Sequence, residues 1–139
     1  IFSQTQILKL LHELKDQFEL TNILISHDLG VVNKMSDNIA VMYLGKIVEY
    51  GKADGVFSHP QHPYTKALFN SIPSLAINSV EELETIEGNV PSAINPPEGC
   101  RFHTRCPFVT DRCKTEEPET VELDKDHMVS CWLYGENHG

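Results

Sequence analysis

Four cysteines in the last 40 residues offer the strongest chemistry in this chain. They are Cys100, Cys106, Cys113 and Cys131, in the pattern C-x5-C-x6-C-x17-C. No secretion signal is visible, so we expect a reducing compartment, where clustered cysteines more often bind metal than form disulfides. The spacing matches neither the C-x2-C of zinc fingers nor the bacterial ferredoxin pattern. Four soft ligands can complete one site, and iron–sulfur and structural zinc both fit that number.

Several neighbours of the cysteines bear on such a site. His103 and His127 lie in the same segment and are candidate substitute ligands, and Trp132 is expected to shield the site by packing. Four cations also stand near the cysteines, namely Arg101, Arg105, Arg112 and Lys114. We expect their charge to offset that of four thiolates. The alternatives are free buried thiols or two disulfides, and exposure to air can leave zinc, disulfides or an empty site.

A histidine at the end of an apolar run is the second chemical feature. Residues 22–26 are predicted to form a buried strand, and His27 follows at its C-terminal tip, where open α/β sheets bind ligands. A neutral imidazole can donate one N–H to a phosphate oxygen. Ser26, His27 and Asp28 are not a hydrolase relay, because adjacent residues of an extended chain point to opposite faces. No G-x-x-x-x-G-K-[ST] loop occurs here, so His27 would be one part of a nucleotide site whose main parts lie elsewhere.

Three helices are expected around these features. Residues 3–18 carry an apolar stripe at helical spacing, behind a capping box formed by Ser3 and Gln6. Asp28 is suited to cap the helix that follows it. Pro63 can start a third helix, which is predicted to run towards Pro73. His59 and His62, just before it, are more simply structural than metal-binding, because no nearby ligand has a matching spacing.

A hairpin completes the first half of the chain. Residues 39–44 and 47–50 are strand-like, with Gly45-Lys46 as a two-residue turn. The order helix, strand, helix, strand, strand indicates the tail of an α/β unit with an edge hairpin. Beyond it, the acidic residues of 116–126 are expected to form a solvated face.

Composition excludes several classes of function. The net charge of −9 argues against binding to nucleic acid and to anionic lipid, because there is no basic surface to neutralise phosphates. No apolar run approaches the roughly 20 residues that a membrane span needs. The apolar fraction of 40% is enough for a modest core. The first residues, Ile1-Phe2-Ser3-Gln4, suggest a cut through a longer protein.

A family resemblance joins these observations. The segments L-I-S-H-D-L and V-M-Y-L-G-K-I-V-E-Y-G resemble the C-terminal half of an ABC transporter ATPase core. The resemblance implies that His27 is the switch-loop histidine, which contacts the γ-phosphate of ATP with its Mg²⁺. It also implies that the Walker A, signature and Walker B segments lie upstream of Ile1. By itself, the chain is therefore expected neither to bind ATP tightly nor to hydrolyse it.

Two further segments resemble one subfamily, the oligopeptide/dipeptide importer ATPases. His62-Pro63-Tyr64-Thr65 resembles the H-P-Y-T segment of these proteins, and residues 99–107 resemble their G-C-x-F-x-x-R-C-P. The resemblance implies that Cys100, Cys106, Cys113 and Cys131 ligate a [4Fe–4S] cluster. A structural cluster that folds the extension is the preferred interpretation, because small folds often depend on a metal.

The resemblance gives a division of the chain and a set of partners. Residues 1–58 are expected to be the C-terminal portion of the ATPase core, and residues 59–139 a small, irregular, cysteine-rich metal-binding extension. The implied function is ATP-driven uptake of oligopeptides or dipeptides at the cytoplasmic face of the cell membrane. The implied partners are a second ATPase subunit, two membrane permeases and an extracytoplasmic peptide-binding protein. The transported peptide is not encoded in this chain.

A rival hypothesis is a free-standing four-cysteine metal-binding module with no nucleotide role. It would explain the missing phosphate loop without a longer parent protein. Under the transporter hypothesis, this chain lacks the strands that should flank its own. We therefore expect it to self-associate through exposed edges and bare helix faces.

Overall fold

The computed structural model describes residues 4–71, 88–124 and 126–134. Contacts divide the chain into two compact units, which we call the N-terminal unit (Ile1–Asp37) and the C-terminal unit (Asn38–Gly139). Among their described residues, the first contains helices as its regular elements, and the second contains short helices with a small antiparallel sheet. This mixed architecture is consistent with the predicted α/β class. Within the described residues, no helix is long and apolar enough to cross a membrane.

The N-terminal unit consists of helices α1 (Gln4–Phe18) and α2 (Leu29–Met35). The predicted cap of α2 is confirmed, because Asp28 Oδ1 accepts a hydrogen bond from Val31 N at 3.2 Å. α1 lies where its apolar spacing predicts it. The proposed capping box begins at Ser3, which lies outside the described residues.

The predicted strand over residues 22–26 is wrong. The segment has no regular secondary structure, and Ile23 and Ile25 are 90% and 93% exposed. A lone strand leaves its backbone N–H and C=O groups unpaired, so it forms only beside a partner strand. The described residues of this unit contain no such partner.

The predicted hairpin is confirmed, with its turn displaced by one residue. β1 (Asn38–Tyr43) pairs antiparallel with β2 (Lys46–Lys52) through a turn at Leu44-Gly45 rather than Gly45-Lys46. Both turn residues have positive φ, 46° and 78°. Positive φ at both positions is typical of a type I′ turn, whose twist matches that of the flanking strands.

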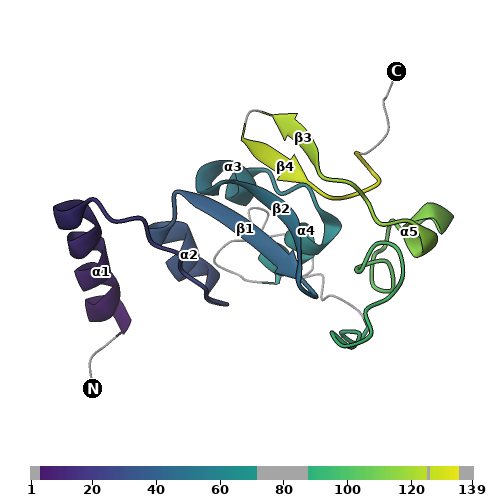
Figure 1. Ribbon diagram of the computed structural model, residues 1–139, viewed down its shortest axis with the longest axis horizontal. Helices are drawn as coiled ribbons and strands as arrows, with labels where there is room; N and C mark the ends of the chain where they lie inside the picture. The colour runs from purple at the N-terminus through teal and green to yellow at the C-terminus, as the bar shows by residue number, and fades with distance from the viewer. Residues whose placement is uncertain (1–3, 72–87, 125, 135–139) are drawn as a thin grey trace. The chain divides into compact units, whose positions relative to one another are not determined.

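Two further strands complete the sheet, in the order β1-β2-β4-β3 (Figure 1). β4 (His127–Val129) lies between β2 and β3 (Val121–Asp124) and pairs antiparallel with both. β3 lies within the acidic run, and its exposure alternates so that Glu122 and Asp124 face solvent. The sheet thus joins segments from either side of the 58/59 division, which itself stays a prediction.

Three short helices belong to the same unit: α3 (Ala53–Ser58), α4 (Pro63–Asn70) and α5 (Asp111–Thr115). The described part of α4 begins at Pro63 as predicted, whereas α3 and α5 were not predicted. The core combines aliphatic and aromatic side chains, with Val56 and Val129 at 0% exposure. Phe102 inserts between the hairpin and α4, 5.2 Å from Tyr43 and 5.4 Å from Tyr64 between ring centroids.

A buried carboxylate connects the sheet to the loop before α4. A bulge in β2 places Val48 as an extra residue opposite β1, so that Val48 and Glu49 are both buried. Glu49 accepts hydrogen bonds from the backbone N–H groups of Gln61, at 3.0 and 3.1 Å, and of His62, at 2.8 Å. It also accepts one from His127 Nε2 at 2.7 Å. These bonds fix the residues just before α4 against β2 and β4.

A four-cysteine cavity as the candidate functional site

The first and third cysteines are held together by the backbone. Cys100 N donates to Cys113 O at 2.8 Å, which joins the loop after Gly99 to α5. Gly99 has a φ of 71°, and a Cβ at this position would lie 2.8 Å from the carbonyl carbon of Lys114. A glycine is therefore needed for this close approach of two backbones. Thr110, the N-cap of α5, places its hydroxyl 3.2 Å from Cys113 Sγ.

The other two cysteines come from neighbouring turns. Cys106 follows a turn closed by the bond from Arg105 N to Phe102 O at 3.0 Å. Cys131 comes two residues after β4, beyond Ser130, whose N–H donates to Val48 O at 2.9 Å. Cys131 is thus positioned by the sheet, and Cys106 by the loop around Phe102.

All four cysteines line one cavity of about 220 Å³. The other lining residues are His62, His103, Phe108, Thr110, Arg112, Trp132 and Leu133. The four thiols are free, with no disulfide among them. The structure thus brings together all four residues that the sequence singled out as metal ligands.

The cavity does not hold its thiols in the geometry of a single-ion site. Among the described residues, no group of three His, Cys, Asp or Glu side chains converges closely enough to bind one metal ion. Burial raises the pKa of Cys100 and Cys106, and raises the pKa of Cys131 to about 11. Since metals bind thiolates, any metal uptake here must release protons.

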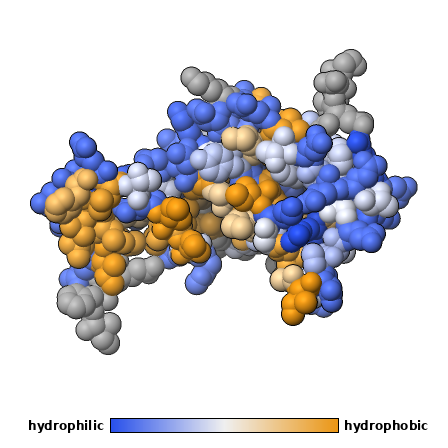
Figure 2. All heavy atoms as spheres, in the orientation of Figure 1, coloured by the Kyte–Doolittle hydropathy of each residue, from blue (hydrophilic) through white to orange (hydrophobic). Residues whose placement is uncertain are grey.

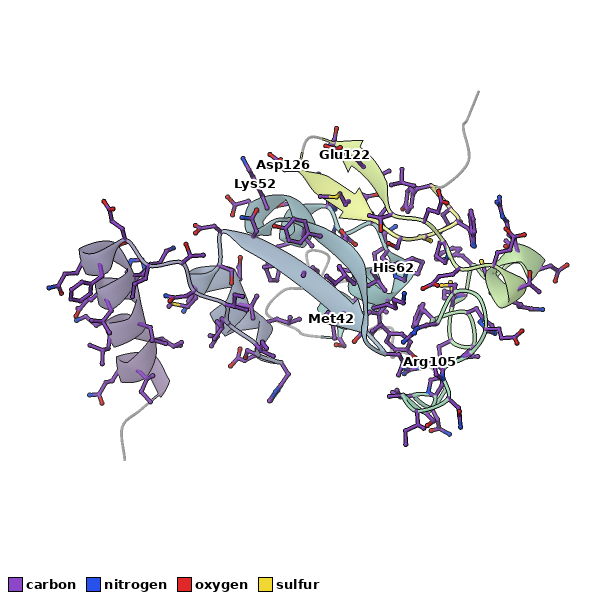
Figure 3. All side chains as sticks on the ribbon, viewed as in Figure 1. Met42, Lys52, His62, Arg105, Glu122 and Asp126 are labelled. Atoms are coloured by element: carbon purple, nitrogen blue, oxygen red, sulfur yellow. The ribbon has the colours of Figure 1, made fainter. Side chains whose placement is uncertain are left out.

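The histidines that line the cavity differ from those that were expected near the cysteines. His103 lines the cavity as expected, but His127 does not, because its Nε2 is bound to Glu49 in the core. His59 is exposed. His62, which was interpreted as structural from its sequence context, lines the cavity (Figure 3). The sequence contains no signal for this place, because it depends on how Glu49 holds the residues before α4.

The two lining histidines carry their protons on opposite nitrogens. His62 Nδ1 accepts from Tyr64 N at 3.0 Å, so the proton of the neutral ring is on Nε2. Burial lowers the pKa of His62 to about 4, with a smaller contribution from Lys66. His103 Nδ1 lies 2.8 Å from Cys100 O, and since a carbonyl only accepts, its Nε2 keeps the lone pair in the neutral ring.

Of the four cations near the cysteines in sequence, Arg112 alone lines the cavity. Its guanidinium lies 3.6 Å above the Trp132 ring, and its Nε is 3.0 Å from Glu116 Oε2. Trp132 also lines the cavity, as its predicted packing role requires, and donates from Nε1 to Glu116 O at 2.8 Å. Arg101 instead donates to Leu44 O in the hairpin turn. The expected offset of thiolate charge by the four cations stays a prediction.

His27 lies in the N-terminal unit, in the exposed bend before α2. Ser26 Oγ accepts from Asp28 N at 3.0 Å, and Asp28 caps α2. Both neighbours of His27 are therefore occupied with local backbone groups, as expected for residues that do not form a hydrolase relay. The His27 side chain itself is open to solvent.

Comparison with known proteins shows a similarity to peptide transporters. Residues 48–113 match the family described as oligopeptide/dipeptide transporter, C-terminal region. The match includes the His-Pro-Tyr segment and three of the four cysteines. The chain is thus similar to the C-terminal region of oligopeptide/dipeptide transporter proteins, in agreement with the resemblance seen in its sequence.

Individual relatives extend the similarity to nearly the whole chain. A dipeptide transport ATP-binding protein, DppD, of Caldanaerobacter subterraneus is 42% identical over 98% of this chain and 41% of its own length. An oligopeptide transport ATP-binding protein, AppF, of Bacillus subtilis is 44% identical over 94% of this chain and 40% of its own length. A di/tripeptide transport ATP-binding protein, DppF, of Pseudomonas aeruginosa is 42% identical over 92% and 39%. The chain thus spans about two fifths of the length of these relatives.

Proposed function

We propose that this chain serves in the ATP-hydrolysing subunit of an ABC importer for oligopeptides or dipeptides. The observation that carries the proposal is the similarity to peptide-transport ATP-binding proteins over 92–98% of the chain. It covers the N-terminal unit as well as the cysteine segment. A free-standing metal-binding module would account for the cysteine segment alone.

In this function, His27 contacts the γ-phosphate of ATP bound by other segments of the complete subunit. The support is its position: it is exposed at the bend that leads into α2, beside two residues already used as local caps. The apolar side chains of α1 are available to pack against another part of the subunit, since Ile7, Leu10 and Phe18 are 50–60% exposed (Figure 2). In the complete subunit, this face packs against the rest of the ATPase core.

Changing His27 to alanine tests the nucleotide role. In the complete subunit within its transporter, loss of one donor to the transferred phosphoryl group should lower the ATP turnover rate by roughly 10²–10³-fold. His12→Ala, which changes a solvent-exposed histidine on α1, is the matched control and should leave turnover unchanged. Equal turnover in His27→Ala and the unaltered subunit would contradict the proposal.

The partners and place of the complete subunit follow from the same proposal. It works with a second ATPase subunit, two membrane permeases and an extracytoplasmic peptide-binding protein. It is attached to the cytoplasmic face of the membrane through the permeases. The acidic surface of this chain is consistent with attachment through protein rather than through anionic lipid.

We further infer that the four-cysteine cavity holds a [4Fe–4S] cluster with Cys100, Cys106, Cys113 and Cys131 as ligands. The support is that four thiols, the ligand number of such a cluster, line one cavity. Four thiolates also suit a zinc ion, which metal analysis distinguishes from a cluster. When bound, the cluster supplies four metal–sulfur links between the loop after Gly99, α5 and the segment after β4. Its role here is structural.

Metal analysis of protein purified without oxygen tests this site. About four irons and four sulfides per chain, with a broad absorption near 400 nm that fades in air, are expected. One zinc with no iron would keep the four-thiolate site and overturn the cluster. Cys113→Ser should abolish the iron, and Ser130→Ala, which changes a residue outside the cavity lining, should retain it.

A further inference from the structure

His62 lines the four-cysteine cavity and has a buried ring nitrogen without a hydrogen-bond partner among the described residues. The residue is 1% exposed, and among the described residues no group forms a hydrogen bond with its Nε2. His62 also lines the cavity with the four cysteines. A buried donor without an acceptor destabilises a fold, so an unpaired donor at a site indicates that the site supplies its acceptor when filled.

The neighbours of His62 determine which chemistry Nε2 can perform. The backbone N–H of Tyr64 can only donate, so Nδ1 must be the unprotonated, accepting nitrogen. The neutral ring therefore carries its proton on Nε2. Nε2 can donate a hydrogen bond, but it has no lone pair with which to bind a metal ion.

We propose that His62 donates its Nε2–H to a sulfur of the iron–sulfur cluster, either a cysteine thiolate or an inorganic sulfide. The inference rests on the proposed cluster in this cavity. Sulfur is the acceptor that such a filled cavity presents, and its negative charge strengthens the bond. His62 is thus a positioning residue for the cluster, while its Nδ1 caps α4.

His103 is the natural contrast on the same wall. Its Nδ1–H is directed at Cys100 O at 2.8 Å, and its Nε2 carries a lone pair. It cannot donate to a sulfur from Nε2 in the neutral form. The two histidines of the cavity therefore have distinct roles, and of the two only His62 has a ring N–H free to donate to the cluster.

The test uses protein reconstituted without oxygen from ferrous iron and sulfide. In protein labelled with ¹⁵N-histidine, pulsed EPR of the reduced cluster should show a ¹⁵N coupling that disappears in His62→Asn. Asparagine is a favoured N-cap, so it can still accept from Tyr64 N, but its shorter side chain ends before the position of Nε2. The midpoint potential of His62→Asn should be lower, because a donor stabilises the more negative, reduced cluster. Loss of iron to a chelator should be about 10-fold faster.

His59→Asn is the matched control, because it makes the same change in an exposed histidine three residues earlier. It should leave the coupling, the potential and the rate of iron loss unchanged. A cluster that forms normally but shows no ¹⁵N coupling and no shift in His62→Asn overturns this inference and leaves the cluster proposal standing. Failure of the unaltered protein to take up iron and sulfide overturns both. If His62→Asn does not fold, absence of the coupling in the unaltered protein is by itself decisive against the inference.

Discussion

The two units of this chain differ in whether their apolar side chains are buried. In the N-terminal unit, no described residue from 6 to 37 is buried, although α1 has a regular apolar stripe. In the C-terminal unit, Val56, Phe102 and Val129 are at most 2% exposed, around a sheet of short strands. Because most helical stability comes from packing of an apolar face, the first unit needs a surface to pack on. Regular helix patterns alone do not make an independently stable unit.

The candidate functional residues also lie in different units. His27 is exposed on the unit without a core, so its proposed contact with ATP requires segments outside this unit. The four cysteines belong to the unit with the core, which brings them to one cavity unaided. His27 would therefore contribute to a site shared with other segments, whereas the four cysteines line a cavity that lies within one unit.

The largest expected effect is the loss of the C-terminal unit when its buried carboxylate is removed. Glu49→Ala leaves three backbone or ring donors of Gln61, His62 and His127 without their acceptor. We expect a loss of about 3–5 kcal/mol in the free energy of unfolding, measured by urea titration of Trp132 fluorescence. Helicity of the N-terminal unit should not change, which would sharpen the contrast between the units.

The matched control is Glu122→Ala, which removes an exposed carboxylate from β3 (Figure 3). It should change the free energy of unfolding by no more than about 0.5 kcal/mol. Equal losses in the two variants would mean that burial of Glu49 contributes nothing to the stability of this unit.

A smaller loss is expected from Gly99→Ala. The new methyl group would meet the backbone of α5 at Lys114 and Thr115, at a positive φ that only glycine adopts without strain. We expect about 2–3 kcal/mol of destabilisation together with weaker iron retention. Gly55→Ala, where no atom lies within 4 Å of the new Cβ, should be neutral or slightly stabilising. A stable Gly99→Ala with full iron content would show that the cavity wall tolerates displacement.

The metal-free C-terminal unit should also lose stability in mild acid because of His62. Its pKa is about 4 in the folded protein, below the ordinary 6.5, so the unfolded chain takes up a proton first as the pH falls. This contribution is fully present above pH 6.5 and is lost between about 6.5 and 4. Its size is roughly 3 kcal/mol. Urea titrations at pH 7 and pH 4.5 should show a steeper decline for the unaltered protein than for His62→Asn, and parallel declines would refute the assignment.

The smallest effect on stability concerns the apolar residues of the N-terminal unit. Ile25→Ser should leave the unfolding of the C-terminal unit unchanged, but it should reduce self-association in light scattering at high concentration. Ile94→Ser is the control, because that isoleucine belongs to the C-terminal unit and is exposed to a similar extent, 89% compared with 93% for Ile25. If both variants self-associate to the same extent as the unaltered chain, Ile25 of the N-terminal unit does not contribute to self-association.

Local patterns predicted the parts of this fold that local interactions determine. The hairpin, the start of α4 at Pro63 and the cap of α2 at Asp28 depend on residues a few positions apart. β4 was missed because its three residues are fixed by pairing with β2, far away in sequence. The strand over 22–26 was wrongly predicted because hydrophobicity specifies a buried strand only where a neighbouring strand exists.

The same distinction applies to the site. The cysteines were identifiable from their type and spacing, since few other roles need four thiols in one short segment. His62 was not, because its place in the cavity depends on how Glu49 anchors the residues before α4. The contacts of Arg101 with Leu44 O and of Lys114 with Asp111 were not predicted either, because they depend on how the loops are folded.

The strand order has a consequence for the sequence of events during synthesis. β4 is inserted between β2 and β3, so β2 has an open hydrogen-bonding edge until residue 129 has left the ribosome. By then, more than fifty residues have been added to the chain since the hairpin and α4 were synthesised. During this interval, the unpaired edge of β2 can pair with strands from other chains. The nascent chain therefore passes through an interval in which one edge of β2 has no partner strand from its own sheet.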